Sequence, residues 1–335
     1  MPARPVLTEP LPAPFDRRVQ LFTGKGGVGK TSVVAGLAME AARRGHRPLI
    51  VELGHRASVP GILAPGRALE VGYAPVEVVP GVFAMNMSLD DALEDYITAQ
   101  VRVRRAARAI TQSQALRRFF HAAPAVNEVV TLHRLSRLAE AAPSARGSFS
   151  PILVDLDATG HALMFLELPR VFEGLASSGP LRTLLDGFSK LLRDEDTTVL
   201  HLVALPLELP AQETHELYEQ LRGNTATGVT ARVPLGALIV NAVPDRPLTP
   251  EELALLPELE AAAPALRADV ALARGAQAAA EDALRVVREL AQRVPLALRR
   301  LPRCEGALGA DALARLGARL LGGAPVYADQ PGASA

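Results

Sequence analysis

The chain has 335 residues, of which 49% are hydrophobic, and it carries 36 lysines and arginines against 36 aspartates and glutamates. These apolar residues are enough for an extensive core, which excludes a disordered or fibrous protein. The balanced charge gives no support to nucleic acid as a partner. The single cysteine, Cys304, excludes an intrachain disulfide, and it excludes a multi-thiolate metal site unless two subunits each supply a ligand.

The two ends of the chain differ in composition from the rest. Residues 1–17 contain five prolines and no apolar stretch long enough for a signal peptide, so we expect an extended, flexible arm. Residues 323–335 are mostly small, with two prolines and two glycines, and we expect a disordered tail. No run approaches the roughly 20 apolar residues of a membrane span. We therefore expect a cytoplasmic protein without an integral membrane segment, whose main domain covers residues 18–322.

Six apolar runs have the continuous hydrophobicity of strands that are covered on both faces. They are "RVQLFT" (18–23), "PLIVEL" (48–53), "GVFAMNM" (81–87), "PILVDL" (151–156), "TVLHLVAL" (198–205) and "LGALIVNAV" (235–243). Helical patterns lie between them, which predicts an α/β fold: a doubly wound, mainly parallel sheet with helices on both faces. Residues 89–142 lack a strand-like run, and we predict a helical insertion there. Residues 250–293 predict one or two long helices.

The stretch "TGKGGVGKTS" (23–32) lies between the first apolar run and a helical pattern. Its glycines let backbone N–H groups converge on an anion, and the following helix offers its N-terminal dipole end. In the motif G-x-x-x-x-G-K-[ST], Lys30 reaches the outer phosphates and the Thr31 hydroxyl ligates Mg²⁺. We predict a P-loop NTPase that binds ATP or ADP with Mg²⁺ through Gly24, Lys25, Gly26, Gly27, Val28, Gly29, Lys30, Thr31 and Ser32.

The loop contains a second lysine, Lys25, that the ordinary motif does not require. The form "GKGGVGKT" resembles the deviant Walker A motif of the signature-lysine ATPases, which include MinD, ParA, the nitrogenase iron protein and the ArsA-like ATPases. The resemblance implies a nucleotide-dependent dimer in which Lys25 reaches the nucleotide of the partner subunit. There it would act with Lys30 on the charge of the transferring phosphoryl group. The alternative is a solvated loop lysine.

A more specific resemblance lies in "ILVDLDATGHALMFLELP" (152–169). Its apolar strand ends in Asp155, which fits a Walker B carboxylate that holds a Mg²⁺-bound water. The segment resembles switch II of the ArsA-like ATPases, the family of arsenite-pump ATPases and tail-anchored-protein targeting factors. The matching residues are Asp155, Thr159, Gly160 and His161, and the departures are Leu156, Asp157 and Ala158. His161 would either sense the nucleotide state or make a local structural hydrogen bond.

Three further segments occur in the same order as in that family. "APAVNEVVTL" (123–132) resembles the start of its helical region, and "LPLELPAQETHELYEQL" (205–221) resembles its strand-then-helix segment with a Glu-Thr pair. "LIVNAVPD" (238–245) resembles the segment whose asparagine, here Asn241, contacts the adenine edge, since an amide can both donate to and accept from a purine. The resemblance covers about residues 18 to 321.

One position departs from the family pattern in a way that concerns catalysis. In the family, the strand after the P-loop helix leads to an aspartate that positions the attacking water. Here the strand continues as "PLIVELGHRAS" (48–58), and Gly54 stands at that position without a side chain that could accept a proton. We therefore expect impaired hydrolysis. Either Glu52 or Asp157 takes over the role, with Asp157 as our catalytic candidate, or a paralogous subunit supplies the aspartate, or ATP occupancy itself is the switch.

The sequence does not identify the molecule on which the protein acts. Arsenite needs clustered thiolates, which one cysteine does not provide. A groove for tail-anchored proteins would favour methionines, which are missing between residues 90 and 142, where "RVRRAAR" (102–108) indicates a solvated basic face or a docking site for an acidic partner. We expect a dimeric switch or chaperone-type ATPase, as a homodimer or with a paralogue, that acts on an unknown protein partner.

The alternative function is a ParA/MinD-like organiser on a membrane or nucleoid surface. Peripheral membrane contact would require a cationic amphipathic C-terminal helix. "DALARLGARLLGG" (311–323) has leucines on one side but only two arginines, so we expect this helix to pack on the sheet instead. A non-hydrolysing partner subunit of a paralogous ATPase is the third possibility.

Overall fold

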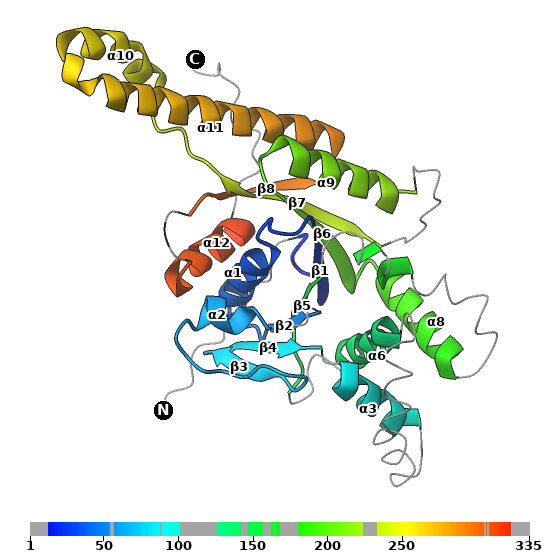
Figure 1. Cartoon of the computed structure of the whole chain (residues 1–335). Coiled ribbons are helices and arrows are strands. Elements are labelled where there is room, and N and C mark those ends of the chain that lie inside the picture. Colours follow the sequence, from blue (N-terminus) through cyan, green and yellow to red (C-terminus); the bar gives the residue numbers. More distant parts are fainter. Residues whose placement is uncertain are drawn as a thin grey trace.

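A single mainly parallel sheet forms the centre of the molecule (Figure 1). The computed structural model describes residues 13–53, 57–87, 89–100, 126–141, 147–156, 162–163, 165–167, 180–223, 233–304, 306 and 308–322. In these residues the strands are β1 (Val19–Thr23), β2 (Leu49–Glu52), β3 (Val76–Val79), β4 (Val82–Asn86), β5 (Ile152–Asp155), β6 (Thr198–Ala204), β7 (Leu235–Val243) and β8 (Ala297–Pro302). Their order is β3-β4-β2-β5-β1-β6-β7-β8, and β3 alone pairs antiparallel with its neighbour.

All six predicted strands are confirmed, and the sheet has two more strands at its edges. Strand β1 lies between β5 and β6, so the first apolar run of the chain is a central strand. The side chains of β1 and β6 are buried along their whole lengths, as expected for strands covered on both faces. The predicted doubly wound α/β architecture is therefore correct.

Helices cover both faces of the sheet. Helices α1 (Lys30–Arg43), α2 (Val59–Leu63) and α12 (Ala310–Gly322) contribute to one apolar core. The core on the other face includes side chains of α6 (Val126–Glu140), α8 (Pro180–Arg193), α9 (Glu208–Leu221) and α11 (Arg267–Arg293). Figure 1 shows α9 and α11 on one side of β7 and β8, with α1 and α12 on the other.

The two expected helical regions are present where the structure describes them. In the predicted insertion, α3 (Leu89–Gln100) packs against α6 through a small apolar cluster that includes Leu93 and Val130, whereas residues 101–125 lie outside the described residues. In the second region, α10 (Pro250–Ala262) and α11 are joined by a 3₁₀ turn at Pro264–Leu266. None of the helices in the described ranges has the length and apolar character needed to span a membrane.

The C-terminal helix α12 packs closely on α1, the helix that follows the P-loop. Leu313 and Leu320 are fully buried in this contact, and Gly36 and Gly317 bring the two backbones together. A Cβ atom on Gly317 would lie 2.0 Å from the Gly36 carbonyl oxygen. The apolar side of α12 is therefore buried within the domain. It contacts β8 of the sheet, as predicted, and also α1, which the sequence did not indicate.

A buried histidine lies in the core on β6, the strand that pairs with β1. His201 of β6 is fully buried and stacks between the rings of Phe15 and Phe22, whose centroids are 4.7 and 4.9 Å from its own. Its Nδ1 accepts a hydrogen bond from the Ala237 N–H at 3.0 Å, so the neutral ring carries its proton on Nε2. Phe15 belongs to the N-terminal stretch for which we predicted an extended arm, yet its side chain is completely buried.

Acid is expected to destabilise the protein through His201. Burial, together with the charge of Arg299, lowers the pKa of His201 to about 3 from its usual 6.5. Below pH 6.5 the unfolded chain binds a proton that the folded state excludes, so the free energy of unfolding falls by up to about 1.4 kcal/mol per pH unit. We expect His201→Gln to remove this part of the pH dependence between pH 6.5 and 4.5 in urea unfolding. Equal slopes for both proteins would refute this assignment.

Candidate functional site

The phosphate loop lies at the edge where the parallel strands end, which we call the carboxyl edge. Residues 24–29 connect β1 to α1, and Lys30 is the first residue of the helix. At two positions of the loop no side chain larger than that of glycine would fit. A Cβ on Gly24 would lie 2.1 Å from the Val203 carbonyl oxygen, and a Cβ on Gly29, whose φ is 86°, would lie 2.3 Å from the amide nitrogen of Asn241. Gly26 and Gly27 are exposed with open space above them, which leaves their backbone accessible to a ligand.

Lys30 folds back over this loop. Its Nζ donates hydrogen bonds to the carbonyl oxygens of Gly24, at 3.1 Å, and Lys25, at 3.3 Å. The ammonium group therefore lies beside the backbone of the loop, at the N-terminus of α1, where the helix dipole also favours an anion. Ser32 follows in the first turn of the same helix and is partly buried.

The predicted metal residues Thr31 and Asp155 lie in contact, although 124 residues separate them. The Thr31 hydroxyl donates to Asp155 Oδ2 at 2.5 Å. Asp155 is the last residue of β5, and its Cα pairs with that of Phe22 on β1, which brings the carboxylate next to the P-loop. A hydroxyl and a carboxylate oxygen at one point form a hard donor set of the kind Mg²⁺ prefers, with water completing the shell.

Asn241 connects β7 to the loop. Its Nδ2 donates to the Val28 carbonyl oxygen at 2.9 Å, and the side chain is half-buried. An amide nitrogen has two hydrogens, so this contact uses only one donor. The amide therefore holds the loop in place and keeps further hydrogen-bonding capacity for a ligand.

Lys25, the additional lysine, pairs within its own chain. Its Nζ donates to Glu213 Oε1, and the second carboxylate oxygen of Glu213 is buried without a hydrogen-bond partner in the described structure. Glu213 lies on α9 and belongs to the Glu-Thr pair noted in the sequence. The pattern gave no indication of its contact with Lys25, because 188 residues lie between them. Sequence reasoning thus missed Glu213 as a site residue.

Glu52 has a structural role that the sequence did not reveal. Its side chain is 3% exposed, and Oε1 accepts hydrogen bonds from the Ser58 N–H at 2.7 Å and the Ser58 hydroxyl at 2.5 Å. Oε1 and Oε2 also accept from the Val59 N–H, at the first turn of α2. A carboxylate engaged in capping is poorly placed to activate water, which disfavours Glu52 as the substitute base.

Several predicted residues lie outside the described part of the chain. They are Gly54, Asp157, Thr159, Gly160 and His161. The segments on either side are described: Glu52 and Asp155 are register partners on adjacent strands β2 and β5. The carboxyl ends of β2 and β5 are therefore neighbours at the carboxyl edge.

Comparison with known proteins relates the chain to a family of ATPases. The family model of anion-transporting ATPases matches residues 17–227. ATPase BagA of Mycobacterium tuberculosis is 30% identical over 254 residues, which cover 75% of this chain and 72% of that protein. ATPase GET3C of Arabidopsis thaliana is 23% identical over 280 residues, covering 67% of this chain and 66% of that protein.

A third relative is much longer than the matched region. The arsenical pump-driving ATPase of Acidiphilium multivorum is 27% identical over 223 residues, which cover 60% of this chain but only 36% of that protein. The family model covers more than half of the chain, and the fold and the P-loop agree with it. The chain therefore belongs to the ArsA-like family of anion-transporting ATPases, whose members bind nucleotide.

Proposed function

We propose that the protein is an ATP-dependent switch that binds Mg-ATP at residues 24–32 and closes as a dimer over the carboxyl edge of its sheet. The observation that carries this proposal is the Thr31–Asp155 hydrogen bond beside the P-loop. It brings the two predicted metal residues together at the start of the helix on which Lys30 lies. This is where a doubly wound sheet binds its ligand.

The phosphates are bound by the loop backbone and by Lys30. The N–H groups of the glycine-rich loop and the N-terminus of α1 provide donors and positive potential for a multiply charged anion. Lys30 then exchanges its contacts with the Gly24 and Lys25 carbonyls for the outer phosphates. Its ammonium is already beside the loop, so only a side-chain rotation is required.

Mg²⁺ fits the oxygen donors at the same point. Thr31 would ligate it directly, and Asp155 would hold one of its waters. When bound, the ion neutralises charge on the β- and γ-phosphates. Asn241 would meet the adenine edge through its remaining donor and its acceptor, while Nδ2 stays bonded to the Val28 carbonyl. Base binding and loop position are then coupled through one amide.

Lys25 acts on the partner's nucleotide in this proposal. It lies in an exposed part of the loop, with 48% of its side chain exposed, so it can leave Glu213 for a second subunit. The partner is a second copy or a paralogue. A ParA/MinD-like membrane organiser receives less support, since α12 buries its leucines against α1.

Hydrolysis is expected to be slow. Gly54 offers no carboxylate, and Glu52 is engaged at α2. A positioned general base contributes about 10²- to 10⁴-fold, so single-turnover phosphate release from Mg-ATP should rise by at least about tenfold in Gly54→Asp. Asp157→Asn tests the remaining candidate and should abolish the residual activity if Asp157 is the base.

Two results would contradict this account. A wild-type hydrolysis rate near the enzyme median of about 10 s⁻¹, unchanged in Asp157→Asn and in Glu52→Gln, would show that hydrolysis is not impaired and that neither carboxylate replaces the missing aspartate. Failure of the wild-type protein to bind Mg-ATP would refute the proposal that it is an ATP-dependent switch. Urea unfolding of each variant provides the control for stability.

A further inference from the structure

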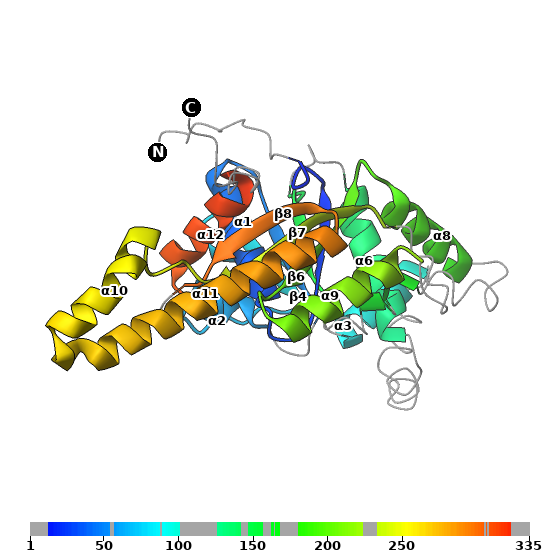
Figure 2. The same cartoon turned by 90° about the horizontal axis from the view of Figure 1, so that it is seen from above.

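An extra residue interrupts strand β7 next to Asn241. Figure 2 shows β7 beside its partner β8. From Val240 to Val243 strand β7 advances by three residues, whereas β8 advances by two, from Arg300 to Pro302. One residue more on one of two paired strands is a β-bulge. The pairing of β7 with β6 also ends at Val240, so Asn241 and the residue after it have no register partner on either side.

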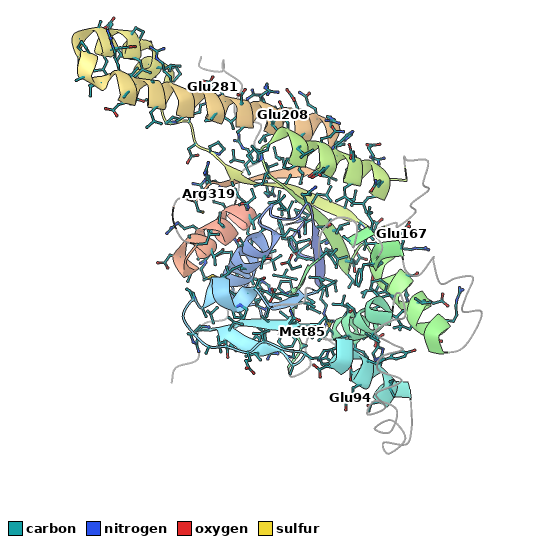
Figure 3. All side chains as sticks on the ribbon, in the orientation of Figure 1. Met85, Glu94, Glu167, Glu208, Glu281 and Arg319 are labelled. Atoms are coloured by element: carbon teal, nitrogen blue, oxygen red, sulfur yellow. The ribbon has the colours of Figure 1, made fainter. Side chains whose placement is uncertain are left out.

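The cores on the two faces of the sheet show where the bulge lies. Side chains of a strand alternate between its faces, and Ile239 belongs to the core with α1 and α12, whereas Val240 belongs to the other core. Figure 3 labels Arg319 on α12, on the first of these faces. Regular alternation would place Val243 on that face too, yet it is buried in the same core as Val240. The bulge therefore follows Asn241, which remains on the face of α1.

The extra residue, Ala242, has an unusual backbone conformation. Its φ is 55°, and among the described residues it is the only one other than glycine with a positive φ. The Cβ atom disfavours this left-handed region, which glycine and asparagine enter more readily. Strained backbone persists where the surrounding structure requires it, and such positions cluster at ligand sites. The strain at Ala242 therefore directs attention to the residue before it.

The amide of Asn241 has a fixed orientation beneath the P-loop. Its Nδ2 donates to the Val28 carbonyl oxygen at 2.9 Å. Turning the amide over would place Oδ1 against that oxygen, so that two acceptors would face each other. Gly29 is also close, since a Cβ atom there would lie 2.3 Å from the same Nδ2. These contacts determine which side of the amide donates and which side accepts.

An amide with a fixed orientation distinguishes adenine from guanine. The second hydrogen on Nδ2 can donate to a ring nitrogen of adenine while Oδ1 accepts from the adenine amino group. Guanine has the acceptor O6 in place of that amino group, so Oδ1 would meet another acceptor. A bidentate pair of an asparagine with adenine discriminates against the wrong base by roughly 10- to 100-fold.

We propose that Ala242 is a positioning residue that gives the nucleotide site its preference for adenine over guanine. This inference rests on the proposed function, because it requires Asn241 to meet the base of a nucleotide bound at the P-loop. The bulge at Ala242 releases Asn241 from the strand register, and the Val28 carbonyl then sets the orientation of the amide. Ala242 thus acts through Asn241.

The test is calorimetric titration of wild type and Ala242→Val with ATP, GTP and tripolyphosphate, each with Mg²⁺. A β-branched side chain is strongly disfavoured at positive φ, so the bulge must change its shape in this variant. We expect the ratio of ATP affinity to GTP affinity to fall from at least about tenfold in wild type to less than about threefold. Tripolyphosphate has no base, so its affinity should fall less than that of ATP.

Other variants separate backbone conformation from side-chain size. Ala242→Gly and Ala242→Asn are the conservative replacements: both accept a positive φ, and asparagine has more side-chain atoms than valine, so both should retain the wild-type ratio. Ala297→Val makes the same change at an exposed position of β8 and should alter no affinity.

Deletion of Ala242 tests the bulge directly if Ala242→Val does not fold. It removes the extra residue and leaves Val243 on its present face by regular alternation, so the strand should still form. Asn241 then stays in the strand register, and the ratio should again fall below about threefold.

The remaining outcomes distinguish this inference from the proposed function. A wild-type protein that binds ATP and GTP equally, or a folded Ala242→Val or deletion variant that keeps the wild-type ratio, would refute the role of Ala242. An equal fall of the ratio in Ala242→Asn and Ala242→Val would show that side-chain size is responsible, which also refutes it. Failure of wild type to bind both ATP and tripolyphosphate would refute the proposed function itself. Urea unfolding establishes which variants are folded.

Discussion

Lys30→Ala is expected to weaken ATP binding by about 10- to 100-fold. The ammonium of Lys30 lies against the loop carbonyls of Gly24 and Lys25, next to the N-terminus of α1. A hydrogen bond from a charged group contributes about 1.5–3 kcal/mol, and about 1.4 kcal/mol corresponds to a factor of ten in affinity. Calorimetric titration of ATP in the presence of Mg²⁺ measures the change directly.

Lys25→Ala is the matched control for that experiment. Lys25 belongs to the same loop and has the same charge, but it pairs with Glu213 of α9. Its removal should change the ATP affinity of the monomer by less than about threefold, because an exposed ion pair contributes little. Equal losses in both variants would show that loop charge alone, rather than the position of Lys30, governs binding.

Gly317→Ala is expected to destabilise the fold by about 1–3 kcal/mol, with the upper end favoured because backbone must move. The new Cβ would lie 2.0 Å from the Gly36 carbonyl oxygen and 2.9 Å from the Glu40 Cβ. Helices α1 and α12 would have to separate, which opens a packed contact in the core. Urea unfolding followed by circular dichroism gives the free energy.

Gly275→Ala is the control and should change stability in the opposite direction. Gly275 lies in the interior of α11, and no atom is within 4 Å of a Cβ at that position. Alanine is favoured over glycine in a helix by about 0.5–1 kcal/mol, so this variant should be more stable than wild type. A Gly317→Ala protein as stable as Gly275→Ala would contradict the close contact of α1 with α12.

The strands that the sequence missed are at the edges of the sheet. β8 reads "ALRRLP", and its two arginines hide the strand pattern; Arg299 is accommodated because its guanidinium donates to the Leu320 carbonyl of α12. β3 reads "VEVV" and pairs antiparallel on one side only. Central strands need continuous apolar side chains, whereas edge strands tolerate polar ones, so periodicity identifies the former more readily.

In the candidate site, too, some residues could be predicted from the sequence and others only from the fold. The P-loop is contiguous in sequence, so its glycines, Lys30 and Thr31 could be predicted as site residues from spacing alone. Asp155 could be predicted as a metal residue because an apolar strand ends at it. The contacts of Lys25 with Glu213 and of Asn241 with Val28 span 188 and 213 residues, and only the sheet topology brings them together. Glu52 resembled a free carboxylate in the sequence, and its capping of α2 depends on the path of the chain after β2.

The most direct test of the dimeric switch is the molecular mass of the wild-type protein with and without Mg-ATP, measured by sedimentation equilibrium alongside Lys25→Ala. We predict a monomer without nucleotide, a dimer with Mg-ATP, and loss of that dimer in Lys25→Ala although it still binds ATP. A wild-type protein that is saturated with Mg-ATP and remains monomeric, or a Lys25→Ala variant that dimerises equally well, would contradict the account.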